Sequence, residues 1–143
     1  MKTSFGKWAV CASLLCAGVA FADEKEADDC LRSKIWSGYD EGWAVRTATT
    51  TTLKAEEHRV YLVTLYEGNE YKISVCGDKN IANVDVVLHN ANGDELKRDE
   101  STDREPIIIY TPSETDTYYV AVYAAQLAEG KSESGVAMAV TYR

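Results

Sequence analysis

The chain has 143 residues, of which 23 are acidic and 15 are basic, and its formal net charge at pH 7 is −8. A surface of this sign repels phosphate backbones, so we expect no nucleic acid partner. The length suits one domain that is large enough to bury a hydrophobic core. Solubility is the simplest role for the acidic surface.

The first 22 residues have the composition of a signal peptide. Lys2 and Lys7 form a basic start, an apolar stretch follows, and the sequence AFA at residues 20–22 has the small-x-small pattern that precedes a cleavage site. The apolar stretch, residues 8–22, is too short to span a membrane as a helix. We therefore expect cleavage after Ala22, no membrane insertion, and a mature chain that is secreted or periplasmic.

The sequence contains four cysteines, and two of them lie in the expected signal peptide. The other two, Cys30 and Cys76, would meet an oxidising compartment after export, so we predict one disulfide between them. Two cysteines without clustered histidines are too few for a zinc site. Their spacing also differs from that of a CxxC redox pair.

Residues 23–41 are predicted to contain one short helix. Acidic residues come first and basic residues come later, an order that suits the helix dipole. Ala27, Leu31 and Ile35 follow one another at helical spacing and form a narrow apolar stripe. The helix must therefore lie against another surface, and the predicted disulfide would place it beside Cys76.

Residues 42–143 are predicted to form a β-domain. Short stretches rich in Val, Ile, Thr and Tyr are bounded by Gly, Pro, Asn or Asp, which is typical of antiparallel sandwiches and barrels. The stretches are AVRTATTTTLKA, RVYLVTLYEG, EYKISVCG, VDVVLHNANG, PIIIYTP, TYYVAVYAA and GVAMAVTYR. No long helical pattern separates them, so a parallel sheet is not expected.

Alternation along these stretches predicts which side chains point into the core. The inward sets are Tyr61, Val63 and Leu65; Tyr71, Ile73 and Val75; Val84, Val86 and Leu88; Tyr118, Val120 and Val122; and Val136, Met138, Val140 and Tyr142. In the same register Lys72, Ser74 and Cys76 face outward. Cys76 would then hold the N-terminal helix against the outside of a sheet.

The stretch VDVVLHNANGDEL, residues 84–96, is predicted to be a strand that ends in a tight hairpin turn. Asn92-Gly93 would supply the positive φ angles that a two-residue turn requires. An EF-hand alignment would place Leu88 at the first ligand position, where it cannot bind an ion. The highly charged KRDESTDREP, residues 97–106, is expected to be a solvated loop between strands.

Three elements in register resemble the bacterial pre-peptidase C-terminal domain family. RVYLVTLYEGNEYKISV is similar to the start of that domain, with two alternating strands around a Gly-containing turn. VDVVLHNANGDEL is similar to its LDLYLYDPDG element, where Asp85 and the Asn92-Gly93 turn match. TDTYYVAVYA is similar to its GTYYVRVYG element, although Thr115-Asp116 replaces the usual Gly. The resemblance covers residues 42–142.

This resemblance implies an eight-stranded, jelly-roll-like β-sandwich without catalytic residues of its own, usually appended to exported enzymes. Related collagen-binding modules bind calcium near their N-terminal linker and use tyrosines on a sheet face. We therefore expect an all-β, antiparallel β-sandwich of about eight strands, with a short N-terminal helix tied to it by the disulfide. Asp85 is expected to lie at a strand edge and not to bind metal.

Tyr66, Tyr119 and Tyr123 are the candidate ligand-binding residues, because they fall on the face opposite the core sets. Exposed, they would form a surface for a protein or a polysaccharide. Alternatively, they would lie buried under the N-terminal segment beside Trp36. The sequence favours burial, although these rings remain the best candidates for a binding surface.

Calcium is the only metal for which the sequence offers candidate ligands, and we expect no other cofactor. Asp40 and Glu41 could form a loose site with the loop acids Asp99 and Asp103. This grouping follows the related modules by location only. The alternative is that these acids belong to solvated loops.

No catalytic pattern stands out in the sequence. His58 lies at a polar strand entrance and His89 faces outward, and GxSxG, HExxH and phosphate-binding glycine loops are absent. We therefore expect a non-enzymatic, exported module for binding or accessory work, with a protein or polysaccharide ligand. The alternatives are a calcium-stabilised structural or adhesive protein and, less favoured, a small hydrolase.

Overall fold

The computed structural model describes residues 22–143, so the predicted signal peptide lies outside the described residues except for Ala22. One helix, α1 (Glu24–Tyr39), is followed by eight strands. The strands are β1 (Ala44–Lys54), β2 (His58–Leu65), β3 (Tyr71–Gly77), β4 (Ile81–His89), β5 (Glu95–Asp99), β6 (Ile107–Tyr110), β7 (Asp116–Leu127) and β8 (Glu133–Tyr142). In this part of the chain, α1 is too short and too polar to cross a membrane.

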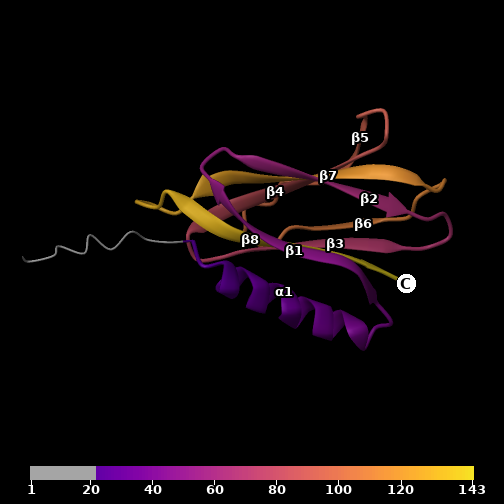
Figure 1. Ribbon diagram of the computed structural model, residues 1–143, viewed down its shortest axis with the longest axis horizontal. Helices are drawn as coiled ribbons and strands as arrows, with labels where there is room; N and C mark the ends of the chain where they lie inside the picture. The colour runs from indigo at the N-terminus through magenta and orange to yellow at the C-terminus, as the bar shows by residue number, and fades with distance from the viewer. Residues whose placement is uncertain (1–21) are drawn as a thin grey trace, which may run out of the picture.

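The strands form two antiparallel sheets that pack face to face (Figure 1). Sheet A has the strand order β1-β8-β3-β6, and sheet B has the order β2-β7-β4-β5. Neighbouring strands pair in antiparallel fashion throughout both sheets. The prediction of an all-β antiparallel sandwich with eight strands and a short N-terminal helix is confirmed.

The core between the sheets consists of the apolar sets that strand alternation predicted. Tyr71, Ile73 and Val75 from β3 meet Val84, Val86 and Leu88 from β4, together with the inward residues of β2, β7 and β8. Tyr61 and Tyr142 are partly buried and pack at the margin of this cluster. The predicted inward register is therefore correct for all five sets.

Helix α1 covers the outer face of sheet A (Figure 1). Ala27 and Leu31 are buried there against Ala137 and Ala139 of β8, with Ile35 partly buried beside them. Small side chains on β8 let the helix approach the sheet closely. The Cys30–Cys76 disulfide joins α1 to β3, as predicted, with an S–S distance of 2.11 Å.

Strand β5 was not predicted from the sequence. Residues 97–99, expected to lie in a solvated loop, belong to this strand and pair with β4. The strand is short and mostly charged, and Leu96 is its only residue that packs against the core. A single apolar residue gives no alternation, so the pattern that identified the other strands was missing here.

The turn between β4 and β5 is longer than the predicted two-residue hairpin. Residues 90–94 connect the strands, and Gly93 has a φ of 85°. Among the described residues Glu56 is the only non-glycine with positive φ, so the expectation for Asn92 was wrong. The Asn90 side chain instead accepts hydrogen bonds from the backbone N–H groups of Asn92 and Asp94, which shapes the turn locally.

Candidate functional site

The outer face of sheet B is not covered by α1, because the helix packs on strands of sheet A. Cross-strand register places Leu62 of β2 beside Tyr119 of β7, and Tyr119 beside His89 of β4. In a second row, His58 of β2 lies beside Tyr123 of β7, and Tyr123 lies beside Asp85 of β4. We name this surface the sheet-B face and define it by His58, Val60, Leu62, Asp85, His89, Arg98, Tyr119 and Tyr123.

Two of the three candidate tyrosines, Tyr119 and Tyr123, lie on the sheet-B face. The alternative that placed them under the N-terminal segment beside Trp36 is wrong, because α1 packs on the other sheet. The physical reason is the position of Cys76 in β3, since the disulfide fixes α1 to sheet A. Tyr119 and Tyr123 are each half-buried by their neighbours.

Tyr66 lies apart from the other two tyrosines. It follows the end of β2, four residues beyond Leu62, which corresponds to about 13 Å along an extended chain. The Arg46 guanidinium stands over its ring at 5.9 Å from the centroid. The structure therefore places two of the three predicted residues on one sheet face, four positions apart on β7, and a ligand-binding role for the set stays a prediction.

The most exposed apolar side chains of the sheet-B face are aliphatic, and they were not among the predicted binding residues. Leu62 is 67% exposed and Val60 is 44% exposed. The alternation that correctly placed Tyr61 and Val63 in the core also places these two side chains outside. The alternation in β2 therefore already indicated that Val60 and Leu62 face outward, but only tyrosines were predicted to bind a ligand.

Asp85 lies at the side of the sheet-B face in a hollow of about 430 Å³ that Glu56, Arg98 and Tyr123 also line. Its Oδ1 atom is buried and has no hydrogen-bond partner among the described residues. Burial raises the pKa of the Asp85 carboxyl, and the positive charge of Arg98 partly offsets this rise. In the described ladders Asp85 pairs only with Tyr123 of β7, because the pairing of β4 with β5 begins at Val86, and this agrees with the expected strand-edge position. This carboxyl can accept a donor from a ligand.

The two histidines lie in different rows of the sheet-B face. The His58 ring stacks on Tyr123 with centroids 5.1 Å apart, whereas His89 lies beside Tyr119. Asp85 and His89 are four residues apart on β4, which corresponds to about 13 Å. Asp85 and His89 are therefore not in contact as an acid–base pair, whereas His58 and Tyr123 share a row with Asp85, and the small hydrolase stays the less favoured prediction.

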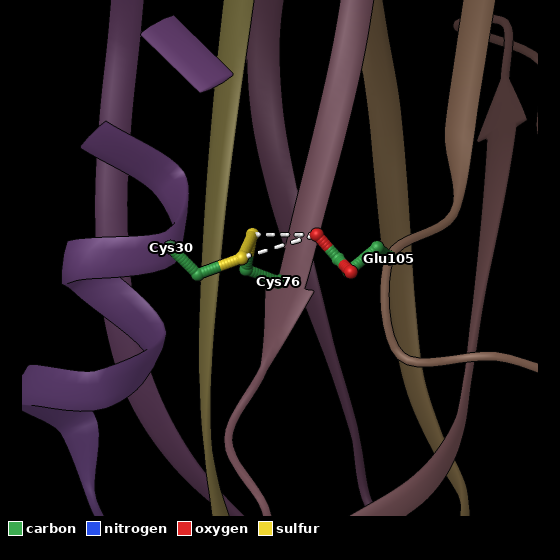
Figure 2. Close-up of side chains that lie close together, drawn as sticks. All are labelled: Cys30, Cys76 and Glu105. Atoms are coloured by element: carbon green, nitrogen blue, oxygen red, sulfur yellow. Dashed lines mark hydrogen bonds between the residues drawn. A yellow bond between two sulfur atoms is a disulfide. The ribbon is translucent and has the colours of Figure 1, made fainter. Parts of the chain in front are cut away.

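A second polar group lies on the other side of the molecule, where α1 crosses sheet A (Figure 2). The Glu105 carboxylate oxygen Oε1 lies 3.3 Å from Sγ of Cys30 and 4.0 Å from Sγ of Cys76. Within residues 22–143 this is the only group of three metal-ligating side chains. Metal binding by cysteine requires a thiolate, so the intact disulfide leaves only a carboxylate at this place.

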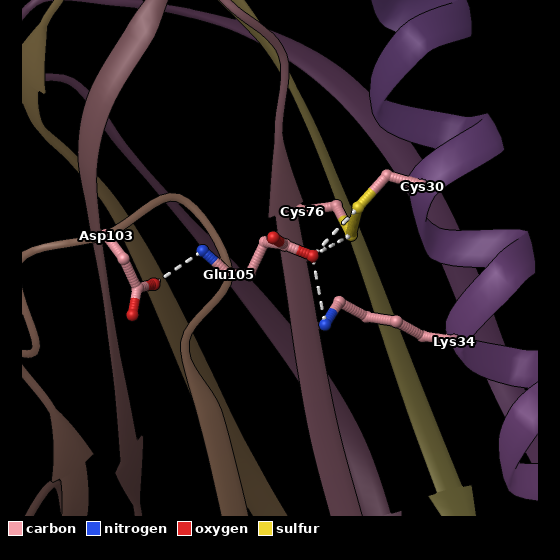
Figure 3. Close-up of a disulfide and its surroundings, with 5 residues drawn as sticks. All are labelled: Cys30, Lys34, Cys76, Asp103 and Glu105. Atoms are coloured by element: carbon pink, nitrogen blue, oxygen red, sulfur yellow. Dashed lines mark hydrogen bonds and ion pairs between the residues drawn. A yellow bond between two sulfur atoms is a disulfide. The ribbon is translucent and has the colours of Figure 1, made fainter.

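The same carboxylate connects the helix to the loop before β6 (Figure 3). Glu105 forms an ion pair with Lys34 of α1 at 3.0 Å, and its backbone N–H donates to Asp103 at 2.7 Å. Both side chains of the ion pair are partly exposed, so the pair contributes at most about 1 kcal/mol. Its role is to position the loop beside the disulfide.

The four acids of the predicted calcium site lie in two different connections. Asp40 and Glu41 lie in the turn between α1 and β1, whereas Asp99 ends β5 and Asp103 lies in the following loop. The carboxylates of Asp99 and Asp103 accept hydrogen bonds from their own loop, including the Ser101 hydroxyl. None of the four belongs to a metal-ligating group found in the described chain. The predicted grouping is therefore not formed.

Because these acids are divided, we expect calcium to leave the thermal stability unchanged. A ligand that binds only the folded state raises the melting temperature, because it stabilises that state by RT ln(1 + [L]/Kd). The measurement is a thermal melt in millimolar calcium and in excess chelator, with magnesium as the control for ionic strength. A midpoint that rises by several degrees in calcium alone would contradict this expectation and revive the calcium-stabilised alternative.

Comparisons with known proteins bear on the fold. No protein-family model and no curated protein matches the sequence. The pre-peptidase C-terminal domain of a collagenase from Bacillus anthracis is similar in structure, with 17% identity and a TM-score of 0.52 over 67% of this chain and 89% of that chain. PliG of Aeromonas hydrophila, a periplasmic inhibitor of g-type lysozyme, is similar with 10% identity and a TM-score of 0.50 over 70% of this chain and 88% of that chain. The chain therefore has a fold like that of the pre-peptidase C-terminal domain.

Proposed function

We propose that this chain is an exported, non-catalytic accessory domain that binds a protein partner through the sheet-B face. The observation that carries the proposal is the exposure of Leu62 and Val60 at 67% and 44% on a sheet face that no other element of residues 22–143 covers. Exposed aliphatic side chains beside aromatic rings are typical of the centre of a protein interface. Tyr119 and Tyr123 supply those rings in the neighbouring strand.

A protein fits this surface better than a polysaccharide. Sugar rings stack on flat aromatic faces and require many hydrogen-bonding groups around them, whereas Leu62 and Val60 offer aliphatic surface only. A protein partner can bury these side chains and gain free energy from the apolar area that leaves water. It can also place a donor beside Asp85, whose Oδ1 atom lacks a partner within the described chain.

Export is supported by two observations. The Cys30–Cys76 disulfide is formed, and stable disulfides persist mainly in oxidising compartments. The first residues have the charge pattern and cleavage site of a signal peptide. The PliG likeness concerns the fold alone, but a g-type lysozyme is a defined protein with which a binding assay can begin.

Replacement of Leu62 by Asp is expected to weaken partner binding about 30-fold or more, because truncation of an interface hot spot costs about 2 kcal/mol. A photo-crosslinking residue at position 60, in the full-length exported chain, first identifies the partner in the native envelope by mass spectrometry. The dissociation constant is then measured by calorimetry with the purified partner.

The matched control is Ile109→Asp, which changes another exposed aliphatic residue, on β6 of the other sheet; Ile109 is 45% exposed and Leu62 is 67% exposed. We expect this variant to bind like the unmodified chain, and both variants to keep its melting temperature within a few degrees. If the two substitutions weaken partner binding equally, the sheet-B face is not the interface. The same holds if Leu62→Asp leaves the yield of the cross-link from position 60 to the partner unchanged.

A further inference from the structure

Asp78 is a fully buried carboxylate in the turn between β3 and β4. Its Oδ1 atom accepts hydrogen bonds from the Asn80 backbone N–H at 2.8 Å and the Ser134 hydroxyl at 2.6 Å. Its Oδ2 atom accepts from the backbone N–H groups of Gly135 at 2.8 Å and Asp23 at 2.7 Å. In residues 22–143, no Lys, Arg or His side chain forms an ion pair with it.

A buried carboxylate without a positive partner is unusual, because desolvation of the charge is costly and hydrogen bonds from neutral donors offset only part of that cost. One of the four donors has a special place in the sequence. The Asp23 nitrogen belongs to the Ala22–Asp23 peptide bond, which is the bond that the signal-peptide pattern predicts to be cleaved.

We propose that Asp78 is the buried binding site for the α-ammonium group of Asp23, which hydrolysis of the Ala22–Asp23 bond creates. The step needs water and an endopeptidase that cuts after small residues, as signal peptidases do. The C–N bond breaks, the water oxygen joins the Ala22 carbonyl carbon to form a carboxylate, and both water protons pass to the Asp23 nitrogen. The neutral N–H donor to Asp78 then becomes a charged one.

The surroundings of Asp23 are shaped for this contact. A Cβ atom on Gly135 would lie 2.7 Å from the carbonyl carbon and oxygen of Asp23 and 2.8 Å from Cα of Glu24. Glycine at this position is therefore what lets the start of the mature chain lie against β8. The Asp23 side chain also caps α1 by accepting a hydrogen bond from the Glu26 backbone N–H at 2.9 Å. Asp23 is thus held from both sides.

Two electrostatic effects act on the new ammonium group in opposite directions. The N-terminal end of a helix dipole is positive and disfavours a cation. Asp78 favours it, and Glu24 and Glu26 of the first turn add negative charge nearby. The contact with Asp78 dominates, because it is a direct hydrogen bond to a buried charge, where the dielectric is low.

It follows that the charged hydrogen bond from the Asp23 nitrogen to Asp78 forms in the mature chain and not in the precursor. This inference rests on the predicted cleavage and is independent of the sheet-B face. The test compares two chains that are both exported and processed from full-length precursors. One has the natural sequence, and the other carries Ala-Ser inserted between Ala22 and Asp23, so that its α-amine lies beyond Asp78. Mass spectrometry of the purified proteins gives each N-terminus.

We expect the unfolding equilibrium constant of the extended chain, measured by denaturant titration, to be at least about tenfold larger than that of the natural mature chain. The extended chain keeps only a neutral hydrogen bond to Asp78, and charge-assisted hydrogen bonds are roughly twice as strong as neutral ones. With Asp78→Asn in both chains, the difference should disappear. Equal stability of the two parent chains, a difference that persists in Asp78→Asn, or cleavage at another bond would each overturn the proposal.

A second measurement does not depend on whether Asp78→Asn folds. Brief acetylation of the native proteins, followed by mass spectrometry, compares the reactivity of the two α-amines, with the exposed Lys79 amine as internal reference. The Asp23 amine should react at least tenfold more slowly than the amine of the extended chain. Equal rates would overturn the proposal.

Discussion

Reduction of the Cys30–Cys76 disulfide is expected to lower the free energy of unfolding by about 4 kcal/mol. The two cysteines are 46 residues apart in sequence, and in the chain-entropy model a cross-link closing a loop of this size destabilises the unfolded state by about that amount. The measurement is denaturant unfolding of the oxidised and the reduced protein, with an expected shift in midpoint to lower denaturant.

Reduction keeps both sulfur atoms in place, so the apolar contacts of α1 with Ala137 and Ala139 can persist. The matched control is the double variant Cys30→Ala and Cys76→Ala, which should resemble the reduced protein and should not respond to reductant. If this variant unfolds at the same denaturant concentration as the oxidised protein, the disulfide contributes little to stability. The helix would then be held mainly by its apolar stripe, the Lys34–Glu105 pair and the Asp23–Asp78 hydrogen bond.

Replacement of Asp78 by Ala is expected to cost about 3–5 kcal/mol, the range seen when one partner of a buried charged network is removed. The substitution leaves the backbone N–H groups of Asn80 and Gly135 without their acceptor in a site that water does not reach. It also separates the start of α1 from β8. The free energy of unfolding, from denaturant titration of the mature protein, is the quantity to measure.

Asp40→Ala is the matched control, because it removes an exposed carboxylate close to the other end of α1. We expect its effect to stay within about 0.5 kcal/mol, as for most surface substitutions. A similarly small effect of Asp78→Ala would mean that water or a rearranged backbone replaces the lost acceptor. A loss close to 5 kcal/mol would identify this carboxylate as a main support of the fold.

Residues that alternate along a strand were placed correctly from the sequence, because one buried face imposes a period of two on the side chains. Val84, Val86 and Leu88 are all in the core, and Cys76 faces outward toward α1 as expected. Strand β5 was not predicted, because its charged residues occur in loops as well as in exposed strands. Leu96 is its only apolar residue that packs against the core, so no alternating pattern marked it as a strand. The length of the β4–β5 turn depended on Asn90, whose side chain competes with the backbone for hydrogen bonds.

The candidate sites were harder to predict than the core. Tyr119 and Tyr123 were known to face away from the core, but alternation cannot tell which of two sheets a helix covers. That choice depended on the pairing of β3 with β8, a contact between residues 59 to 71 positions apart in sequence. The four proposed calcium ligands were grouped after the location of the site in the related modules, whereas the structure has them at two different connections, α1–β1 and β5–β6.

The sequence by itself determined the sandwich class, the inward and outward sides of its main strands, the disulfide and the short helix. These features follow from local periodicity and from the chemistry of single residue types. Only the tertiary structure decided that sheet B has an uncovered outer face, that Leu62 and Asp85 lie on it, and that Asp78 meets the backbone of Asp23. Each of these depends on strand order and on contacts between distant segments, which residue patterns along a single chain do not encode.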